Sequence, residues 1–451
     1  MKLYLGTIIL IQQKINISAD KLVAFALAEP HSAGFCILDS CSVGALRSNQ
    51  MIIGLDPVET LSISNIEPSV ILDKLESLFN GNVPMIFTLS YDFGMKLQQI
   101  KSSQTTSSAE PDIFATTFNS LVVHDYDTRE TTLIGNAETC QNLSQRLIRS
   151  ISNFKYEIRN SESFVKSNFT KSEYLAAVEN IRERIRRGYT YQTNLTQQLT
   201  AELSSELTPQ QIFWRLKRQH PAPFSAYIER GDSTIISASP ELFFRVENGS
   251  KIVASPIKGT RPRGRNTLED NQLRHELVNS KKDLAENTMI VDLLRNDIGR
   301  VCEFGSVVVE KLCEIEEHPS LFHLVSTISG KLRDDAKTSD IIKALFPCGS
   351  ITGAPKISTM QIIDDIEPTP RGLSMGALGC YLPSCFLSDE SRLELSVAIR
   401  TMVIRERTAT FNVGGGIVID SDGESEYVET LTKATSLLDA IGGNKSDLNG
   451  V

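Results

Sequence analysis

The stretch Thr234-Ile-Ile-Ser-Ala-Ser-Pro-Glu-Leu-Phe-Phe-Arg-Val246 contains two short apolar runs, residues 234–238 and 242–246, on either side of Ser-Pro-Glu241. Runs of this length that are rich in Ile, Phe and Val are typical of buried β-strands. Further short apolar runs occur at 35–38, 52–55, 85–89, 121–124, 393–399 and 408–413. The predicted strands therefore come from both ends of the chain.

A helix is predicted to begin at Thr170-Lys-Ser-Glu173, which has the spacing of a capping box. Apolar residues then recur at helical period up to Ile185, and Gly188 ends the helix. Strands, helices and strands follow one another without βαβ alternation, which predicts an α+β fold with antiparallel sheets packed against helices.

Composition excludes several classes of protein. The 451 residues carry a net charge of -9, which disfavours binding to nucleic acid or to an anionic membrane surface. None of the eight cysteines forms a CxxC pair, so we expect reduced thiols in a cytoplasmic protein. The apolar run Leu3–Ile11 ends at Gln12 without a cleavage site and predicts a buried strand, and no apolar stretch reaches the length of about 20 residues that spans a membrane.

Two groups of acidic residues point to a cation. Glu286 precedes Met289 and Ile290 by three and four residues, which places its carboxylate on an apolar helix face, where either a structural arginine or a metal would neutralise it. Glu426, Glu429 and Lys433 share one face of a second predicted helix, where Glu429 and Lys433 have the spacing of a solvated salt bridge.

Two loops have the composition of anion sites. Consecutive glycines at 414–416 allow backbone N–H groups to converge on an anion, and with Arg400 and Lys433 they predict a carboxylate pocket. The loop Ser255-Pro-Ile-Lys258-Gly-Thr260 holds a lysine between apolar and small residues, which indicates either a reactive amine or a basic anion-binding loop. Glu241 begins an apolar strand and is expected to point into the same cleft.

Ordered motifs carry a family resemblance. Ser-Pro-Glu241-Leu-Phe, Pro-Ile-Lys258-Gly-Thr, Ala-Glu286-Asn-Thr-Met-Ile-Val-Asp-Leu-Leu-Arg-Asn-Asp297, Ser350-Ile-Thr-Gly-Ala-Pro-Lys356, and Gly-Gly-Gly416-Ile with Glu426-Tyr-Val-Glu429-Thr resemble the chorismate-binding enzymes. The resemblance is looser toward the N-terminus, and it implies an N-terminal region at 1–155, a catalytic region at 165–445 and a layered β/α/α/β sandwich.

Two positions discriminate between branches of this family. Gln192 stands where the isochorismate-forming branch has a lysine base, and Lys258 stands where anthranilate synthases typically carry alanine. The chain thus resembles the aminodeoxychorismate synthases, which aminate chorismate to 4-amino-4-deoxychorismate for para-aminobenzoate and folate. The alternatives are an anthranilate synthase component I and a non-catalytic chorismate-binding regulatory protein.

The resemblance also implies residue roles. Lys258 would be the nucleophile and Glu241 the acid, while Glu286, Glu429 and Glu426 would hold Mg²⁺. The residues expected to bind chorismate are Gln192, Gly259, Thr260, His323, Ser350, Ile351, Thr352, Arg400, Gly414, Gly415, Gly416 and Lys433.

Two further ligands are expected from the same resemblance. No cysteine lies in the Gly-x-Cys-x-Gly context of a glutaminase, so a separate glutamine amidotransferase subunit would supply ammonia. Relatives hold a tryptophan pocket in their N-terminal part, and the matching positions here are Ser40 and Pro223-Phe224-Ser225. L-Tryptophan as a structural ligand and an empty pocket are equally compatible with these residues.

Overall fold

The computed structural model describes residues 2–5, 8–30, 32–43, 49–104, 108–150, 162–317, 321–384, 386, 390–444 and 448. Two large sheets dominate it, and the paired strands in both of them are antiparallel. The first sheet has the strand order β1 (Lys2–Leu5), β2 (Ile8–Ile15), β9 (Glu130–Gly135), β8 (Leu121–Asp125), β4 (Gln50–Gly54), β3 (Cys36–Asp39), β12 (Phe224–Glu229), β13 (Thr234–Ser239), β22 (Thr401–Arg405), β23 (Thr408–Ile417), β11 (Gln192–Glu202) and β10 (Phe164–Ser167), with β19 (Gly353–Ala354) paired to β11.

The second sheet combines strands from distant parts of the sequence in the same way. Its order is β16 (Ile257–Pro262), β18 (Leu321–Lys331), β15 (Lys251–Ala254), β14 (Leu242–Glu247), β21 (Arg392–Val397), β20 (Ala377–Leu382), β6 (Met85–Leu89), β7 (Ile113–Phe118) and β5 (Pro57–Ile63), with β17 (Val308–Glu317) paired to β18. Both sheets therefore contain strands from the 1–155 region and from the 165–445 region.

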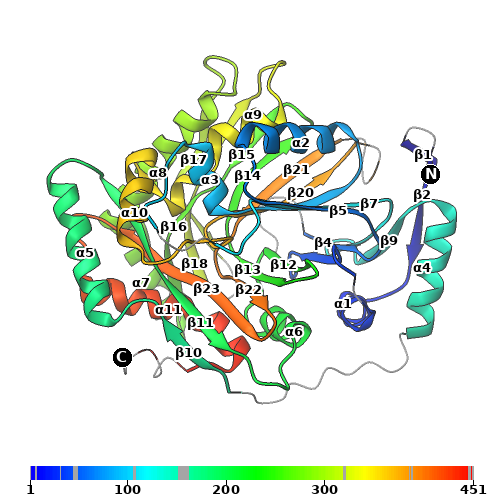
Figure 1. Ribbon diagram of the computed structural model, residues 1–451, viewed down its shortest axis with the longest axis horizontal. Coiled ribbons are helices and arrows are strands. Elements are labelled where there is room, and N and C mark those ends of the chain that lie inside the picture. Colours follow the sequence, from blue (N-terminus) through cyan, green and yellow to red (C-terminus); the bar gives the residue numbers. More distant parts are fainter. Residues whose placement is uncertain are drawn as a thin grey trace.

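Helices cover the outer face of each sheet (Figure 1). The helices on the first sheet are α1 (Ala19–Ala28), α4 (Ala137–Ser150), α5 (Lys171–Arg186), α6 (Pro209–Gln219) and α11 (Gly423–Ile441). Those on the second sheet are α2 (Pro68–Asn80), α3 (Tyr91–Leu97), α8 (Lys281–Gly299) and α9 (Thr338–Leu345). Helix α10 (Lys356–Ile366) contacts β11 and β19 of the first sheet and contributes Met360 to the core of the second. Helix α7 (Thr267–Val278) packs beside β16, and a short 3₁₀ turn, η1, spans Gly349–Ile351.

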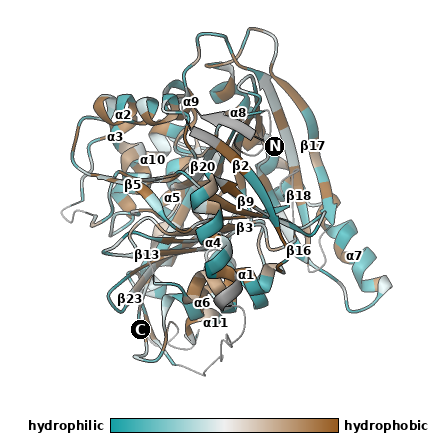
Figure 2. Ribbon diagram, turned by 90° about the vertical axis from the view of Figure 1, so that its right-hand side faces the viewer, coloured by the Kyte–Doolittle hydropathy of each residue, from teal (hydrophilic) through white to brown (hydrophobic). Residues whose placement is uncertain are grey.

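A third apolar cluster fills the space between the two sheets. It joins residues of β3, β4, β8 and β12 to residues of β6, β7 and β20. In Figure 2 the strands in the middle of the view are mainly brown, whereas α7, at the right-hand edge, is mainly teal. The α+β fold with antiparallel sheets packed against helices is confirmed, and this third cluster also packs the two sheets on each other.

Several local predictions are confirmed. Helix α5 begins after Thr170, whose side chain forms the capping box with Glu173, and Gly188 follows its end with a φ of +79°. The apolar run at 3–11 differs from the single strand predicted for it: it forms β1 and the start of β2, and Gly6 and Thr7 lie outside the described residues. The seven cysteines that the structure describes are all free thiols, and Cys385 lies outside the described part.

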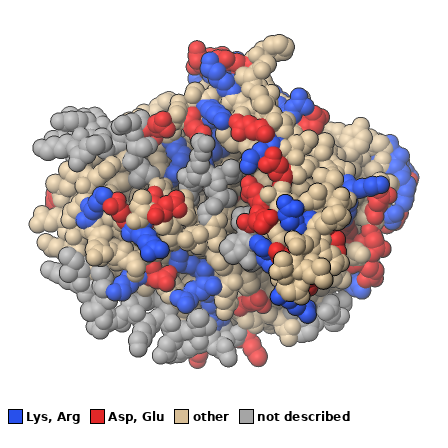
Figure 3. All heavy atoms as spheres, turned by 180° about the vertical axis from the view of Figure 1, so that it is seen from behind, with Lys and Arg blue, Asp and Glu red and all other residues tan. Residues whose placement is uncertain are grey.

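The described residues show how charges are distributed on one face of the surface and whether any helix could span a membrane. On the face shown in Figure 3, acidic and basic side chains are interspersed. No helix within the described ranges is long and apolar enough to cross a membrane.

Candidate active site

The predicted nucleophile and acid lie beside the same turn of the chain. Lys258 is in β16, and its Nζ atom donates a hydrogen bond of 3.2 Å to the backbone oxygen of Ser350. Glu241 directly precedes β14, and the Ser350 side chain hydrogen-bonds to its carboxyl group. Ser350 therefore contacts both predicted reactive groups at once.

The environment of Glu241 suits an acid. Its side chain is 5% exposed, and its Oε1 atom has no hydrogen-bond partner in the described part of the chain. Burial raises the pKa of this carboxyl above its usual range, although the Ser350 hydroxyl and Lys258 act to lower it. A raised pKa keeps more of the carboxyl protonated near neutral pH, as general acid catalysis requires.

The loop at the start of β16 lies close to helix α8 because residue 259 is a glycine. Gly259 has a φ of +87°, and a Cβ atom there would lie 3.0 Å from the Asp283 side chain. Thr260 pairs with His323 across β16 and β18, and a hydrogen bond of 2.8 Å joins Thr260 Oγ1 to His323 Nδ1. The structure thus places Gly259, Thr260 and His323, three of the predicted substrate-binding residues, next to one another.

The three glycines at the end of β23 lie against helix α11. A Cβ atom on Gly415 would lie 3.3 Å from Glu426 Oε2 and 3.4 Å from Lys433 Nζ. Lys433 donates a hydrogen bond of 3.0 Å to the Gly414 oxygen and lies 2.8 Å from a carboxylate oxygen of Glu429. The predicted salt bridge between Glu429 and Lys433 therefore forms, and it forms directly beside the glycines.

Gln192 is buried without any hydrogen bond to its side chain. It is 0% exposed, and neither Oε1 nor Nε2 has a partner among the described residues. A side chain on Gly416 would overlap this amide, so the glycine leaves the space that the amide occupies. A buried polar group without a partner is costly, which makes the Gln192 amide available to a ligand.

The remaining predicted substrate-binding residues occupy two places. Ile351 and Thr352 lie in and after η1, where the Thr352 hydroxyl donates a hydrogen bond of 3.1 Å to the Cys348 oxygen and so supports the turn. Arg400 has a φ of +49°. Burial lowers the pKa of the Arg400 guanidinium, and the charge of Glu241 opposes this shift, so the two side chains are electrostatic neighbours.

The three predicted metal ligands surround a lysine. Lys282 lies 3.0 Å from Glu426 Oε1, and it also interacts electrostatically with Glu286 and Glu429. Burial raises the pKa of Glu286, whereas Lys258 and Lys282 act to lower it. Burial also acts to raise the pKa of Glu429, but the lysines around it, Lys433 first, give a net lowering.

The chemistry of these carboxylates fits a hard divalent cation. Carboxylate oxygens are the ligands that Mg²⁺ prefers. The positively charged Lys282 ammonium already interacts with all three carboxylates, so the group can accommodate a cation. In the described part of the chain, however, no three such side chains are gathered closely enough to form a complete metal centre. A metal would therefore require these side chains to close around it.

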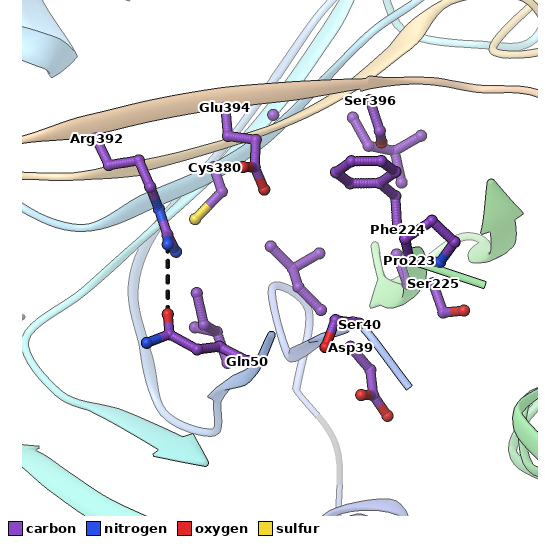
Figure 4. Close-up of a pocket in the computed structure, with 15 residues that line it drawn as sticks. Asp39, Ser40, Gln50, Pro223, Phe224, Ser225, Cys380, Arg392, Glu394 and Ser396 are labelled. Atoms are coloured by element: carbon purple, nitrogen blue, oxygen red, sulfur yellow. Dashed lines mark hydrogen bonds between the residues drawn. The ribbon is translucent and has the colours of Figure 1, made fainter. Parts of the chain in front are cut away.

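The four residues predicted for a tryptophan pocket line one cavity between the two sheets (Figure 4). Strand pairing brings them together, because Ser225 of β12 lies opposite Asp39 of β3, and Asp39 is adjacent to Ser40 in the chain. Sequence reasoning missed other lining residues, since they come from several strands with no shared motif: Asp39, Gln50, Arg392, Glu394 and Ser396.

Sequence reasoning also missed Lys282 and Cys348. Lys282 precedes Glu286 by four residues, and this helical spacing was the signal that it lies beside the acidic group. Cys348 Sγ lies 3.3 Å from the Ser350 hydroxyl, and nothing in the local pattern indicated that contact.

Comparisons with known proteins identify the family. A family model described as chorismate binding enzyme matches residues 40–439. The chain belongs to the chorismate-binding enzymes. Among curated members of this family, it is 38% identical over 363 residues to aminodeoxychorismate synthase component 1 of Salmonella typhimurium, covering 80% of this chain and 76% of that protein.

Two other relatives show how wide the resemblance is. An anthranilate synthase component 1 of Haloarcula marismortui is 39% identical over 284 residues, covering 63% of this chain and 56% of that protein. The crystal structure of anthranilate synthase component I from Streptococcus pneumoniae aligns with a TM-score of 0.75 at 28% identity, covering 87% of this chain and 93% of that chain. The fold and the family are thus those of the chorismate-binding enzymes.

Proposed function

We propose that this chain is component I of an aminodeoxychorismate synthase, which converts chorismate and ammonia to 4-amino-4-deoxychorismate and water. The observation that carries the proposal is the contact of Ser350 with both Lys258 and Glu241. Relatives named aminodeoxychorismate synthase component 1 match about four-fifths of the chain, which supports the same activity.

The proposed reaction has two displacement steps. The Lys258 amine attacks C2 of chorismate, the double bond shifts, and the C4 hydroxyl leaves as water with a proton from Glu241. Ammonia then adds at C4, the double bond shifts back, and Lys258 leaves C2 as the free amine. The new ammonium group at C4 returns a proton to Glu241, so the product differs from chorismate only by an amino group in place of the C4 hydroxyl.

The other residues bind and orient the substrate in this proposal. Arg400, Lys433, Thr260, His323 and the 414–416 amides would hold its two carboxylates by charge-assisted hydrogen bonds. Glu286, Glu426 and Glu429 would hold Mg²⁺, which supplies positive charge against a substrate carboxylate. Gln192 and the 350–352 turn would contact the ring side of the substrate.

The proposal also includes partners and a location. The relatives are named as component 1, which supports a second subunit, and we assign that subunit as a glutamine amidotransferase in the cytoplasm. The cavity between the sheets would take L-tryptophan as a structural ligand, because the residues at the positions of the family's tryptophan pocket line it together with apolar side chains.

Product analysis tests the function directly. The purified chain is incubated with chorismate, Mg²⁺ and an ammonium salt, and the products are separated by chromatography. We expect 4-amino-4-deoxychorismate from the wild type and none from Lys258→Ala. Fluorescent anthranilate as the product would instead assign the chain to the anthranilate synthases, which its similarity to the Haloarcula protein keeps as the second candidate. No consumption of chorismate would leave a binding protein without activity.

A further inference from the structure

A second cavity, with both apolar and charged side chains in its lining, lies between helix α3, the 100–104 segment and the C-terminal end of α10. Tyr91 lines this cavity, is 3% exposed, and has a hydroxyl without a hydrogen-bond partner among the residues described. A buried hydroxyl without a partner is unfavourable, so the position favours a bound polar molecule.

Two of the three cations that line this cavity are already paired with carboxylates. Arg371 stacks on the Tyr91 ring at 4.6 Å and donates to both carboxylate oxygens of Glu367 over 2.8 and 2.7 Å. Lys96 is bound to both oxygens of Asp112 at 2.7 and 2.8 Å. The third cation of the lining, Lys101, is exposed to solvent, where its charge is screened.

Hydrogen-bond acceptors in the cavity keep spare capacity. The Asp92 carboxyl accepts from the Gly372 amide at 3.1 Å and from the Ser108 side chain, whereas two carboxylate oxygens offer about four lone-pair sites. Burial raises the pKa of Asp92 to about 7. Together with the Tyr91 oxygen, these acceptors favour a small ligand that donates hydrogen bonds, such as ammonium, over an anion.

Arg371 connects the floor of this cavity to the candidate active site. It donates hydrogen bonds to the backbone oxygens of Ile351, at 2.9 Å, and of Asn194, at 2.6 Å. Asn194 and Gln192 lie two positions apart on β11, so their side chains share one face of the sheet. The Asn194 Nδ2 atom and the Gln192 amide are both buried without partners within the described residues.

We propose that this cavity binds the nitrogen substrate, as ammonium or ammonia, on its way to the Gln192 side of the active site. The inference rests on the proposed amination of chorismate. Tyr91 and Asp92 supply the acceptors, and the unpaired amides of β11 extend the polar lining toward the turn at Ser350.

The test separates the affinity for ammonium from the affinity for chorismate. Tyr91→Phe removes only the unpaired hydroxyl, and Asp92→Asn removes the negative charge and replaces one acceptor oxygen by an NH2 donor. With saturating chorismate and Mg²⁺, each variant is expected to raise the KM for ammonium by about tenfold, as the loss of one hydrogen bond to a charged ligand does. The KM for chorismate stays within about twofold of the wild type, since neither residue touches its site.

A matched control is available on β7. Thr116 also has a buried hydroxyl without a partner, but it does not line this cavity, so Thr116→Val should leave the KM for ammonium unchanged. An unchanged KM for ammonium in both cavity variants overturns the inference. A variant that does not melt cooperatively is not correctly folded. If this applies to Tyr91→Phe, the KM for ammonium of Asp92→Asn alone decides whether the inference holds. A wild type that makes no product from chorismate and ammonium overturns the proposed function instead.

Discussion

The Nζ atom of Lys282 lies 3.0 Å from Oε1 of Glu426, whose side chain is 3% exposed. The Ser421 hydroxyl donates to the same oxygen over 2.7 Å. A single ammonium thus neutralises a buried carboxylate at the centre of the predicted metal ligands. Because Lys282 belongs to α8 and Glu426 to α11, the pair also joins the helix on one sheet to the helix on the other.

Lys282→Met should destabilise the metal-free protein. The change leaves the Glu426 carboxylate buried with only one hydrogen bond, and we expect the free energy of unfolding to fall by about 2 kcal/mol in EDTA. Mg²⁺ should restore more stability to this variant than to the wild type, because it replaces the lost positive charge. Thermal melts with and without Mg²⁺ measure both effects.

The control for this variant is Lys171→Met. Lys171 pairs with Glu424 on the protein surface, where both side chains are about half exposed, so its loss should hardly change the melting temperature. Equal melting temperatures for Lys282→Met and the wild type in EDTA would contradict the structural role of the buried pair.

Ser350→Ala should move the pH dependence of the reaction. The Ser350 hydroxyl acts to lower the pKa of Glu241, so removing it raises that pKa further. A general acid is active while protonated, and the upper limb of the kcat/KM profile should therefore shift to higher pH. Steady-state kinetics across the pH range give the measurement. Ser358→Ala, which removes a hydroxyl bound to the Tyr189 oxygen outside the site, should leave the profile in place.

Gly259→Ala should lower the free energy of unfolding more than Gly188→Ala does. Both glycines have a positive φ, +87° and +79°, so an alanine at either position is strained by about 1–2 kcal/mol. Only at Gly259 would the new Cβ also meet the side chains of Leu277 and Asp283. Chemical denaturation should show the larger loss of stability for Gly259→Ala, and turnover should fall only there because Lys258 is adjacent. Equal losses at both positions would mean that the contact has no effect.

Glu286→Gln should weaken the binding of Mg²⁺ by about tenfold or more, since a neutral amide replaces a charged ligand. Isothermal titration of Mg²⁺ into the protein measures the change without reliance on activity. Asp292→Asn is the matched control, because its side chain lies on the same helix and is 81% exposed. Removal of Mg²⁺ with EDTA should stop amination, and activity that persists in EDTA would exclude the metal from the reaction.

Local patterns were sufficient to predict the individual elements. The capping box at Thr170 and the apolar runs at 85–89, 121–124, 234–238 and 242–246 correspond to α5, β6, β8, β13 and β14, because each depends on neighbours only a few residues away. The ordered motifs also indicated which glutamates, lysines and glycines to examine. The N-terminal run at 3–11 showed the limit of such patterns, since it forms two strands.

The tertiary structure alone decided how these elements are layered and which side chains meet. The order of layers depends on which faces of two sheets are apolar toward each other, and no local window contains that information. The Ser350 contacts with Lys258 and Glu241, the Lys282 position between three carboxylates, and the cavity at Tyr91 all join residues far apart in sequence. The sequence by itself determined the types of reactive group and their family, whereas long-range strand pairing set the distances between them.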